Sequence, residues 1–355
     1  MALWALQVGG LLPGAYLQGP AWHAHEMLFG YTLAVITGFL FTAVRNWTSH
    51  DTPTGGLLAG YAALWIAGRV LVLTPFVDAA ALVNAMFPIA VAIGIGVPLA
   101  QAGNKRNHFF VALLCAFAMA ACAFYASLLG LIERPPRASL QGGLDMVLFI
   151  MAVIGGRVIP MFTNNGVPGA GATRNAWVER VSLGSVLAVF AWDLAGLPGI
   201  GGVASIAAIA NAVRLVLWRP WRTGGNPLVW ILHAAYGWIV AHFALRALAA
   251  AGAVPEAAAI HALTVGAIGS MTLGMMTRTA LGHSGRTLRA GRAELAAYVL
   301  VTLAALVRVA GATAMPSFYA ATIVASGFLW SGAFAVYVAA YWPILTRPRA
   351  DGKPG

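Results

Sequence analysis

Apolar runs of about 18 or more residues, with few charges inside them, recur along nearly the whole chain. Inside a bilayer every backbone N–H and C=O group must be paired within the protein, and an α-helix of about 20 residues achieves this while it spans about 30 Å of hydrocarbon. Only 9% of the 355 residues are charged, whereas soluble domains carry about 25%. The sequence therefore predicts an all-α, polytopic transmembrane helix bundle.

The hydropathy pattern divides residues 1–355 into about twelve helical segments of a single transmembrane domain. The first segment, near 1–18, is expected to be short or truncated. The others are predicted near 24–44, 56–74, 77–101, 108–132, 139–161, 177–196, 198–218, 226–250, 256–279, 293–311 and 317–344. Proline or glycine at many of the joints, such as Pro135-Pro136 and Pro198-Gly199, favours a helix end there.

Positive charges alternate between the two ends of these segments. Arg or Lys follows every even-numbered segment, whereas the connections after the third, seventh, ninth and eleventh segments hold neither. The connection after the fifth segment, with Arg134 and Arg137, is the exception. Because basic loops face the cytoplasm, both termini are predicted to be cytoplasmic. The net charge of +11 lies in these loops, which indicates membrane topology and contact with lipid rather than nucleic-acid binding.

Histidines inside the predicted helices are the main candidates for function, because an ionisable side chain is costly to bury in hydrocarbon. His23 and His25 open the second segment on the predicted outer side, and His261 lies about 8 Å inside that same side in the tenth segment. Neutral imidazole is a common ligand of iron and copper, so these three, at similar depth, are candidate metal ligands. His23 and His25 point about 200° apart on a helix, so they would serve two neighbouring sites unless His23 lies in the entry turn. The alternative, a neutral ring that hydrogen-bonds to a backbone carbonyl, stays open for each of them.

Two further histidines lie in the ninth segment. His233 is placed about 10 Å from the cytoplasmic end, and His242 follows nine residues later. Nine residues on a helix correspond to about two and a half turns, so the two rings point to opposite faces. One of them is expected to face the interior of the bundle. His50 and His108 lie in loops, where water solvates them.

Four stretches of the sequence resemble the NnrS family of multi-helix bacterial membrane proteins. The stretches are "HAHEMLFGYTLAVITGFLFTAVRNWT", "GGRVIPMFTNN", "LHAAYGW" and "HALTVGAIGSMTLGMMTRTALGHSGR", and they occur in family order between residues 23 and 286. The resemblance implies a haem- and copper-containing protein of the bacterial inner membrane. It also implies a role in the response to nitric oxide, in nitrosative-stress resistance or in denitrification.

The resemblance further implies which side chains bind the cofactors. The metal ligands that it suggests are His23, His25, His233, His261 and His283. Arg157 and Arg278 are expected to contact a cofactor, and for Arg157 a haem propionate is a fitting partner. His242 lies outside the four stretches and is not expected to be a ligand.

Two other functions stay open at this point. A secondary transporter would use buried histidines and arginines as a solute or proton path, and it would carry no chromophore. A haem–copper oxidoreductase that reduces nitric oxide would need a dense set of histidines and an acidic proton route, yet only ten Asp and Glu are present. Under the resemblance, nitric oxide or a related small molecule is the expected ligand, and the sequence identifies no electron donor. Redox turnover and simple binding are both compatible with it.

Overall fold

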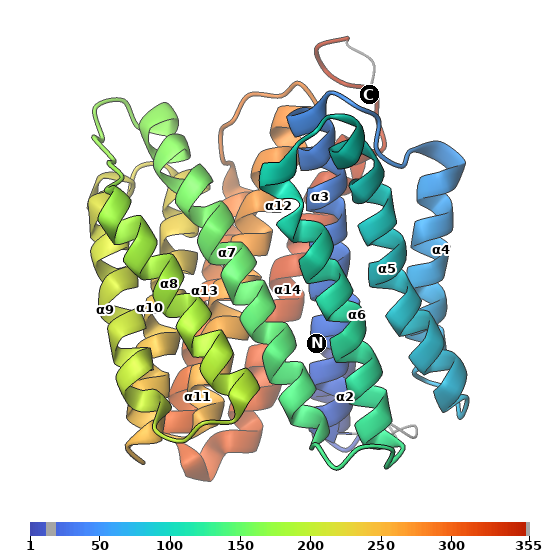
Figure 1. Cartoon of the computed structure of the whole chain (residues 1–355). Helices are drawn as coiled ribbons and strands as arrows, with labels where there is room; N and C mark the ends of the chain where they lie inside the picture. The colour runs from blue at the N-terminus through green and yellow to red at the C-terminus, as the bar shows by residue number, and fades with distance from the viewer. Residues whose placement is uncertain (12–18, 353–355) are drawn as a thin grey trace. The chain divides into compact units, whose positions relative to one another are not determined.

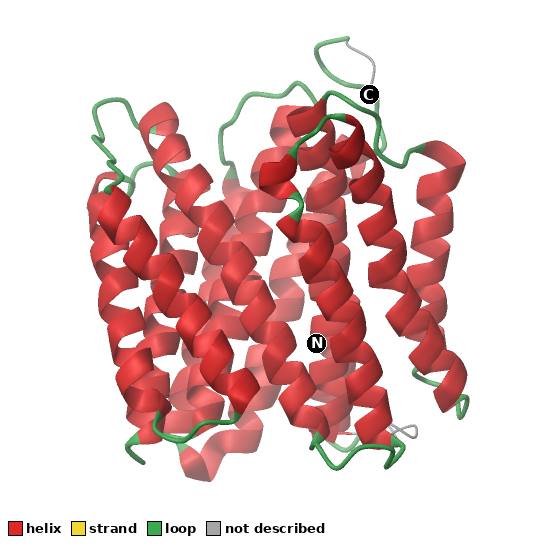
Figure 2. Ribbon diagram, in the orientation of Figure 1, coloured by secondary structure: helices red, strands yellow, loops and turns green. Residues whose placement is uncertain are grey.

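The computed structural model describes residues 1–11 and 19–352. The described residues form helices joined by loops, with no strand among them (Figure 2), so the prediction of an all-α bundle of about twelve helices is confirmed. They divide into two compact units, and the expectation of one transmembrane domain stays a prediction. The smaller unit is Pro13–Val147, and the larger unit is Met1–Leu12 together with Leu148–Gly355.

The smaller unit carries the first long span of the chain. This span, Gly19–Thr48, is a continuous run of α2 (Gly19–His25), the π-helix η1 (Glu26–Thr32) and α3 (Leu33–Thr48). The rest of the unit consists of α4 (Gly55–Leu71), α5 (Val77–Gln101), the 3₁₀ turn η2 (Lys105–Asn107), α6 (Phe109–Leu128) and the first part of α7 (Pro136–Gly166). Helix α5 packs against α3, α4 and α6.

The larger unit begins with α1 (Ala2–Val8), which packs against the last helix. The first predicted segment reached residue 18, and residues 12–18 lie outside the described residues. The unit continues with the end of α7, α8 (Ala176–Ala195), α9 (Ile200–Leu217), η3 (Pro220–Arg222), α10 (Pro227–Ala250), α11 (Glu256–His261), the π-helix η4 (Ala262–Gly269), α12 (Ser270–His283), α13 (Arg292–Thr313), η5 (Pro316–Phe318) and α14 (Tyr319–Leu345) (Figure 1).

Helix α10 holds the centre of the larger unit, because it packs against α9, α11, η4 and α12. The small residues Gly266 and Gly274 allow side chains of α10 to approach the backbone of η4 and α12 closely. A Cβ at Gly266 would lie 2.5 Å from ring carbons of Trp238, and one at Gly274 would lie 2.8 Å from Cγ2 of Ile231. Gly266 and Gly274, on one helical run, therefore form a helix-packing surface against α10.

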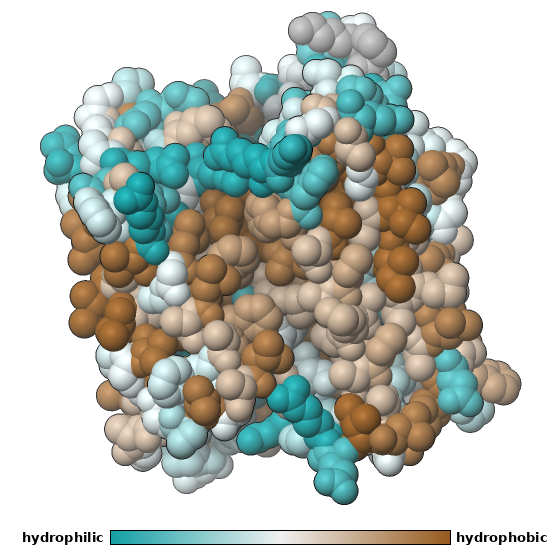
Figure 3. Space-filling view, in the orientation of Figure 1, coloured by the Kyte–Doolittle hydropathy of each residue, from teal (hydrophilic) through white to brown (hydrophobic). Residues whose placement is uncertain are grey.

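Nine of the described helical spans are long and apolar enough to cross a membrane. Their outward faces expose large hydrophobic side chains, such as Leu82 and Ile93 on α5 and Ile206 and Ile209 on α9. Figure 3 shows hydrophobic side chains along the helices and hydrophilic ones gathered towards their ends. Exposed apolar surface of this extent is unfavourable in water and suits hydrocarbon. The chain is a polytopic membrane protein.

Candidate functional site

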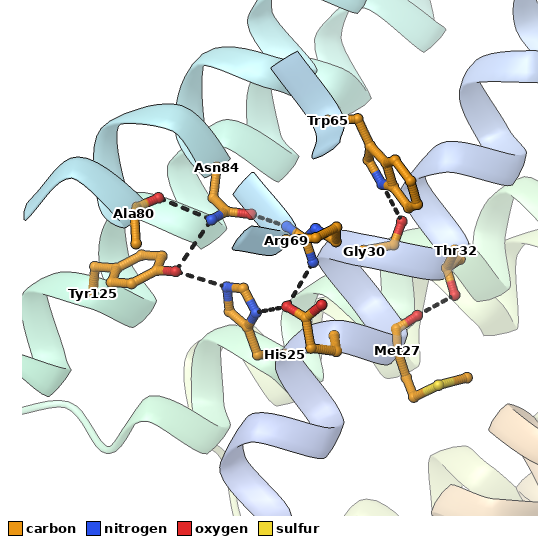
Figure 4. A network of polar contacts seen from close by, with 10 residues as sticks. His25, Met27, Gly30, Thr32, Trp65, Arg69, Ala80, Asn84 and Tyr125 are labelled. Atoms are coloured by element: carbon orange, nitrogen blue, oxygen red, sulfur yellow. Dashed lines mark hydrogen bonds and ion pairs between the residues drawn. The ribbon is translucent and has the colours of Figure 1, made fainter. Parts of the chain in front are cut away.

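The His25 imidazole is fully buried in the smaller unit, and both of its ring nitrogens have partners (Figure 4). Nδ1 lies 2.9 Å from Oε1 of Glu26, and Nε2 lies 3.0 Å from the hydroxyl oxygen of Tyr125. Since a carboxylate only accepts, Nδ1–H donates to Glu26 and the Tyr125 hydroxyl donates to Nε2. In this arrangement His25 has no lone pair left for a metal, and its predicted role as a ligand stays a prediction.

Arg69 closes the same network from α4. Its Nη1 donates to Oε1 of Glu26 over 2.6 Å, and its Nη2 donates to Oδ1 of Asn84. The Asn84 amide in turn donates to the Tyr125 hydroxyl oxygen over 3.3 Å. A side chain at Gly30 would overlap the Arg69 guanidinium. The charges of Glu26 and Arg69 therefore balance each other, and Nε of Arg69 is the one nitrogen of this guanidinium that is buried without a partner among the described residues.

Two histidines of the larger unit are held differently, each through a backbone carbonyl of α11. His242 is fully buried on α10, and its Nδ1 lies 2.8 Å from the Ala259 oxygen. His261 is half-buried at the end of α11, and its Nδ1 lies 2.6 Å from the Ala257 oxygen. A carbonyl only accepts, so Nδ1 carries the proton in both rings and Nε2 carries the lone pair.

The Nε2 atoms of these two rings have no protein partner among the described residues; that of His242 is also completely buried. Histidines that bind metals commonly donate Nδ1–H to a carbonyl and present Nε2 to the ion. The α11 carbonyls therefore fix both rings, and each ring keeps an Nε2 lone pair that no described residue uses. The sequence had predicted His261 and had discounted His242.

Arg308, on α13, lies within electrostatic range of His261. Its side chain is 6% exposed, its Nη2 donates to the Tyr319 hydroxyl over 3.1 Å, and its Nη1 is buried without a partner. No carboxylate of the described residues forms an ion pair with it. Arg246 differs, since Asp193 accepts two hydrogen bonds from it, at 2.6 and 2.7 Å. An unpaired buried guanidinium suits an incoming carboxylate.

His233 of α10 and Arg278 of α12 each contact a side chain of α7, and the two contacted residues, Thr163 and Phe162, are neighbours in the chain. Thr163 Oγ1 donates to the Ile159 carbonyl over 2.8 Å, so it must accept from His233 Nε2–H, also at 2.8 Å. This leaves His233 Nδ1 buried, with a lone pair and no partner. The Arg278 guanidinium carbon lies 3.9 Å from the ring centroid of Phe162.

The remaining predicted site residues are less buried. His23 is half-buried on α2, Arg157 is half-buried on α7, and His283 is exposed at the end of α12. His23 and His25 belong to the smaller unit, whereas His233, His261 and His283 belong to the larger one. Among the described residues, no three His, Cys, Asp or Glu side chains come together as a metal-binding group.

Sequence reasoning missed a buried cluster in the larger unit that links four helices. Arg214 of α9 donates to Glu179 of α8, to the Ala152 carbonyl of α7 and to the Tyr236 hydroxyl of α10. The Tyr236 hydroxyl donates to Oδ1 of Asn211 over 2.6 Å. The signal available was the pair of polar residues, Asn211 and Arg214, within an otherwise apolar run.

Comparison with known families gives one match. The family model described as "NnrS protein" matches residues 1–349, which is nearly the whole chain. No curated protein matches the chain.

Proposed function

The chain belongs to the NnrS family, and from that premise we propose that it binds haem in its larger unit and acts on nitric oxide or a related small molecule. The observation that carries the proposal is the pair of α11-anchored imidazoles, His242 and His261, whose Nε2 lone pairs have no protein partner. In the His25 ring, by contrast, both nitrogens are hydrogen-bonded.

The donor set fits a haem. His242 or His261 would supply an imidazole nitrogen to the iron, and Arg308 would pair with a propionate through its unpartnered Nη1. Bound haem iron would supply a coordination position for a diatomic ligand. The Ala257 and Ala259 carbonyls hold the two rings in one tautomer.

Copper fits less well. A copper site needs several side-chain ligands with nitrogen or sulfur donors, and no group of three His, Cys, Asp or Glu is assembled among the described residues. His233 Nδ1 is an isolated imidazole lone pair, on a residue nine positions before His242 in α10. The described residues therefore fit haem better than copper.

The test is an absorption spectrum and iron analysis of the full-length protein, purified in detergent from cells supplied with haem precursors. The wild type is expected to show a Soret band that shifts when nitric oxide is added. His242→Ala and His261→Ala are each expected to lower the haem content, because each removes a lone pair positioned for iron. The control is His108→Ala, which alters an exposed histidine of the smaller unit and is expected to keep the haem content.

A colourless, iron-free wild-type protein would contradict the proposal and would favour a transporter in which the buried histidines line a solute path. Full haem content in both His242→Ala and His261→Ala would leave haem binding intact but would reject these two ligands. In that case His233→Ala and His23→Ala are the next variants to test.

A further inference from the structure

Buried arginines in the larger unit fall into two classes. Arg214 and Arg246 are neutralised, because Glu179 and Asp193 each accept two hydrogen bonds from them. Arg278 and Arg308 have no carboxylate among the described residues. A guanidinium within a membrane bundle without a counter-charge is costly, so its retention indicates a ligand. Arg308 belongs to the site proposed for haem. Arg278 is the other buried arginine without a counter-charge among the described residues, and it lies outside that site.

Arg278 is 8% exposed on α12, and the described residues give it neither a hydrogen bond nor an ion pair. Its guanidinium carbon lies 3.9 Å from the centroid of the Phe162 ring, which supports one face of the planar group. Stacking of this kind leaves the N–H groups at the edge of the guanidinium free to donate. The Phe162 ring thus holds Arg278 in place without accepting a hydrogen bond from its N–H groups.

Polar groups of α12 and α13 are already hydrogen-bonded to other partners. Thr277 Oγ1 donates to the Gly274 carbonyl over 3.0 Å, so the hydroxyl of Tyr298 donates to Thr277. The buried carboxylate of Glu294 accepts from the Gly291 N–H and from the Tyr341 hydroxyl, both at 2.7 Å. None of these groups is bonded to Arg278. The charge of Arg278 therefore has no counter-charge among the described residues.

We propose that Arg278, stacked on Phe162, is the binding site of a small free oxyanion of the carboxylate or nitrite type. A planar oxyanion can accept two parallel N–H bonds from the fork of one guanidinium. Arg278 lies seventeen residues after His261 in the same helical run, which corresponds to about 25 Å. The site therefore does not depend on the haem proposed at α11, and it can be tested on protein from which haem is absent.

The experiment measures thermal unfolding of the full-length protein in detergent while sodium nitrite, nitrate, acetate or chloride is added at one ionic strength. Binding to the folded state raises the unfolding temperature, on the order of a few °C once the anion exceeds its Kd about 100-fold. The wild type is expected to respond to the oxyanions more strongly than to chloride. A greater response to nitrite and nitrate assigns an inorganic ligand, and a greater response to acetate assigns a carboxylate.

Three variants decide whether Arg278 is responsible. Arg278→Gln is expected to abolish the response, and Arg278→Lys to weaken it about 10-fold or more, because an ammonium offers no planar fork. Phe162→Leu keeps the charge but removes the stacking partner, so about 2- to 10-fold weaker binding is expected. The control is Arg289→Gln, at an exposed arginine after α12, which is expected to respond like the wild type.

Stability without any anion separates this proposal from a structural role. Removing an unpaired buried charge is expected to leave the unfolding temperature of Arg278→Gln equal to or above that of the wild type. A structural arginine would instead give a lower unfolding temperature. A wild type that does not respond to any oxyanion, or an equal response in Arg278→Gln, would overturn the proposal.

Discussion

His25 and His261 occupy equivalent places in two different helical runs, since each is the last residue before a π-helix. In each run a glycine follows five residues later, Gly30 in η1 and Gly266 in η4. Each glycine is the point where a large side chain comes close to the backbone: Arg69 lies against Gly30, and Trp238 lies against Gly266. π-Helical turns are rare and are frequent at functional sites. Both turns directly follow a histidine predicted from sequence as a ligand.

The close approach at Gly266 gives the first prediction. In Gly266→Ala the new Cβ would lie 2.5 Å from two ring carbons of Trp238, a contact that neither the packed ring nor the backbone can absorb without moving. We expect a loss of about 1–3 kcal/mol of unfolding free energy, measured by denaturant unfolding in detergent. Gly202→Ala on α9 is the matched control, because nothing lies within 4 Å of its Cβ position. Equal stability of the two variants would contradict the packing.

The second prediction concerns the ion pair between Arg214 and Glu179. Nε and Nη2 of Arg214 lie 3.0 and 2.5 Å from the two oxygens of Glu179, and the arginine is almost completely buried. Glu179→Gln leaves that charge without a counter-charge and is expected to cost about 3–5 kcal/mol of stability. Thermal unfolding of the detergent-solubilised protein measures this.

A double-mutant cycle is the control for this pair. Arg214→Met combined with Glu179→Gln removes both charges, so the double variant is expected to be more stable than Glu179→Gln alone. The Tyr236 hydroxyl and the Ala152 carbonyl still lose a donor, so recovery to the full wild-type stability is not expected. Strict additivity of the two single effects would show that the pair is not coupled.

The third prediction separates the two histidine environments. Tyr125→Phe removes the hydroxyl that donates to His25 Nε2 and accepts from Asn84. It is expected to cost about 1–3 kcal/mol of stability, since buried polar atoms are left unpaired. Under the haem site proposed at α11, the Soret band of this variant keeps its position and its intensity per protein. A changed band would instead return His25 to the set of haem ligands.

Hydropathy predicts where the helices lie because a helix that crosses lipid needs about 20 consecutive, mostly apolar residues. The predicted range 77–101 is the range of α5, a run of 25 residues that begins after Pro75. The π-helices could not be predicted, since a π turn adds one residue without changing the apolar character of the run. For the same reason the depth and direction of His25 and His261 could not be read from helix geometry alone.

The use of each histidine could not be read from sequence either, because it depends on residues far away along the chain. Tyr125, which occupies His25 Nε2, lies one hundred residues from it. His242 depends on Ala259 of the next helix, whose carbonyl fixes the tautomer and frees Nε2. Sequence motifs identified imidazoles in apolar surroundings. The three-dimensional packing is needed to distinguish His25, in which both ring nitrogens are hydrogen-bonded, from His242, in which Nε2 keeps a free lone pair.

The fourth prediction is the orientation of the chain in the bacterial inner membrane, with both termini in the cytoplasm. Helix α10 has 24 residues, which at 1.5 Å per residue span about 36 Å and so suffice to cross the hydrocarbon. The loop before it carries Arg219 and Arg222, whereas the loop after it, around Gly252, has no basic residue. A reporter fused after Arg222 is therefore expected to be cytoplasmic, and one fused after Gly252 periplasmic. Because only α10 separates the two fusions, the same signal from both would mean that α10 does not cross, and exchanged signals would mean that the whole orientation is inverted.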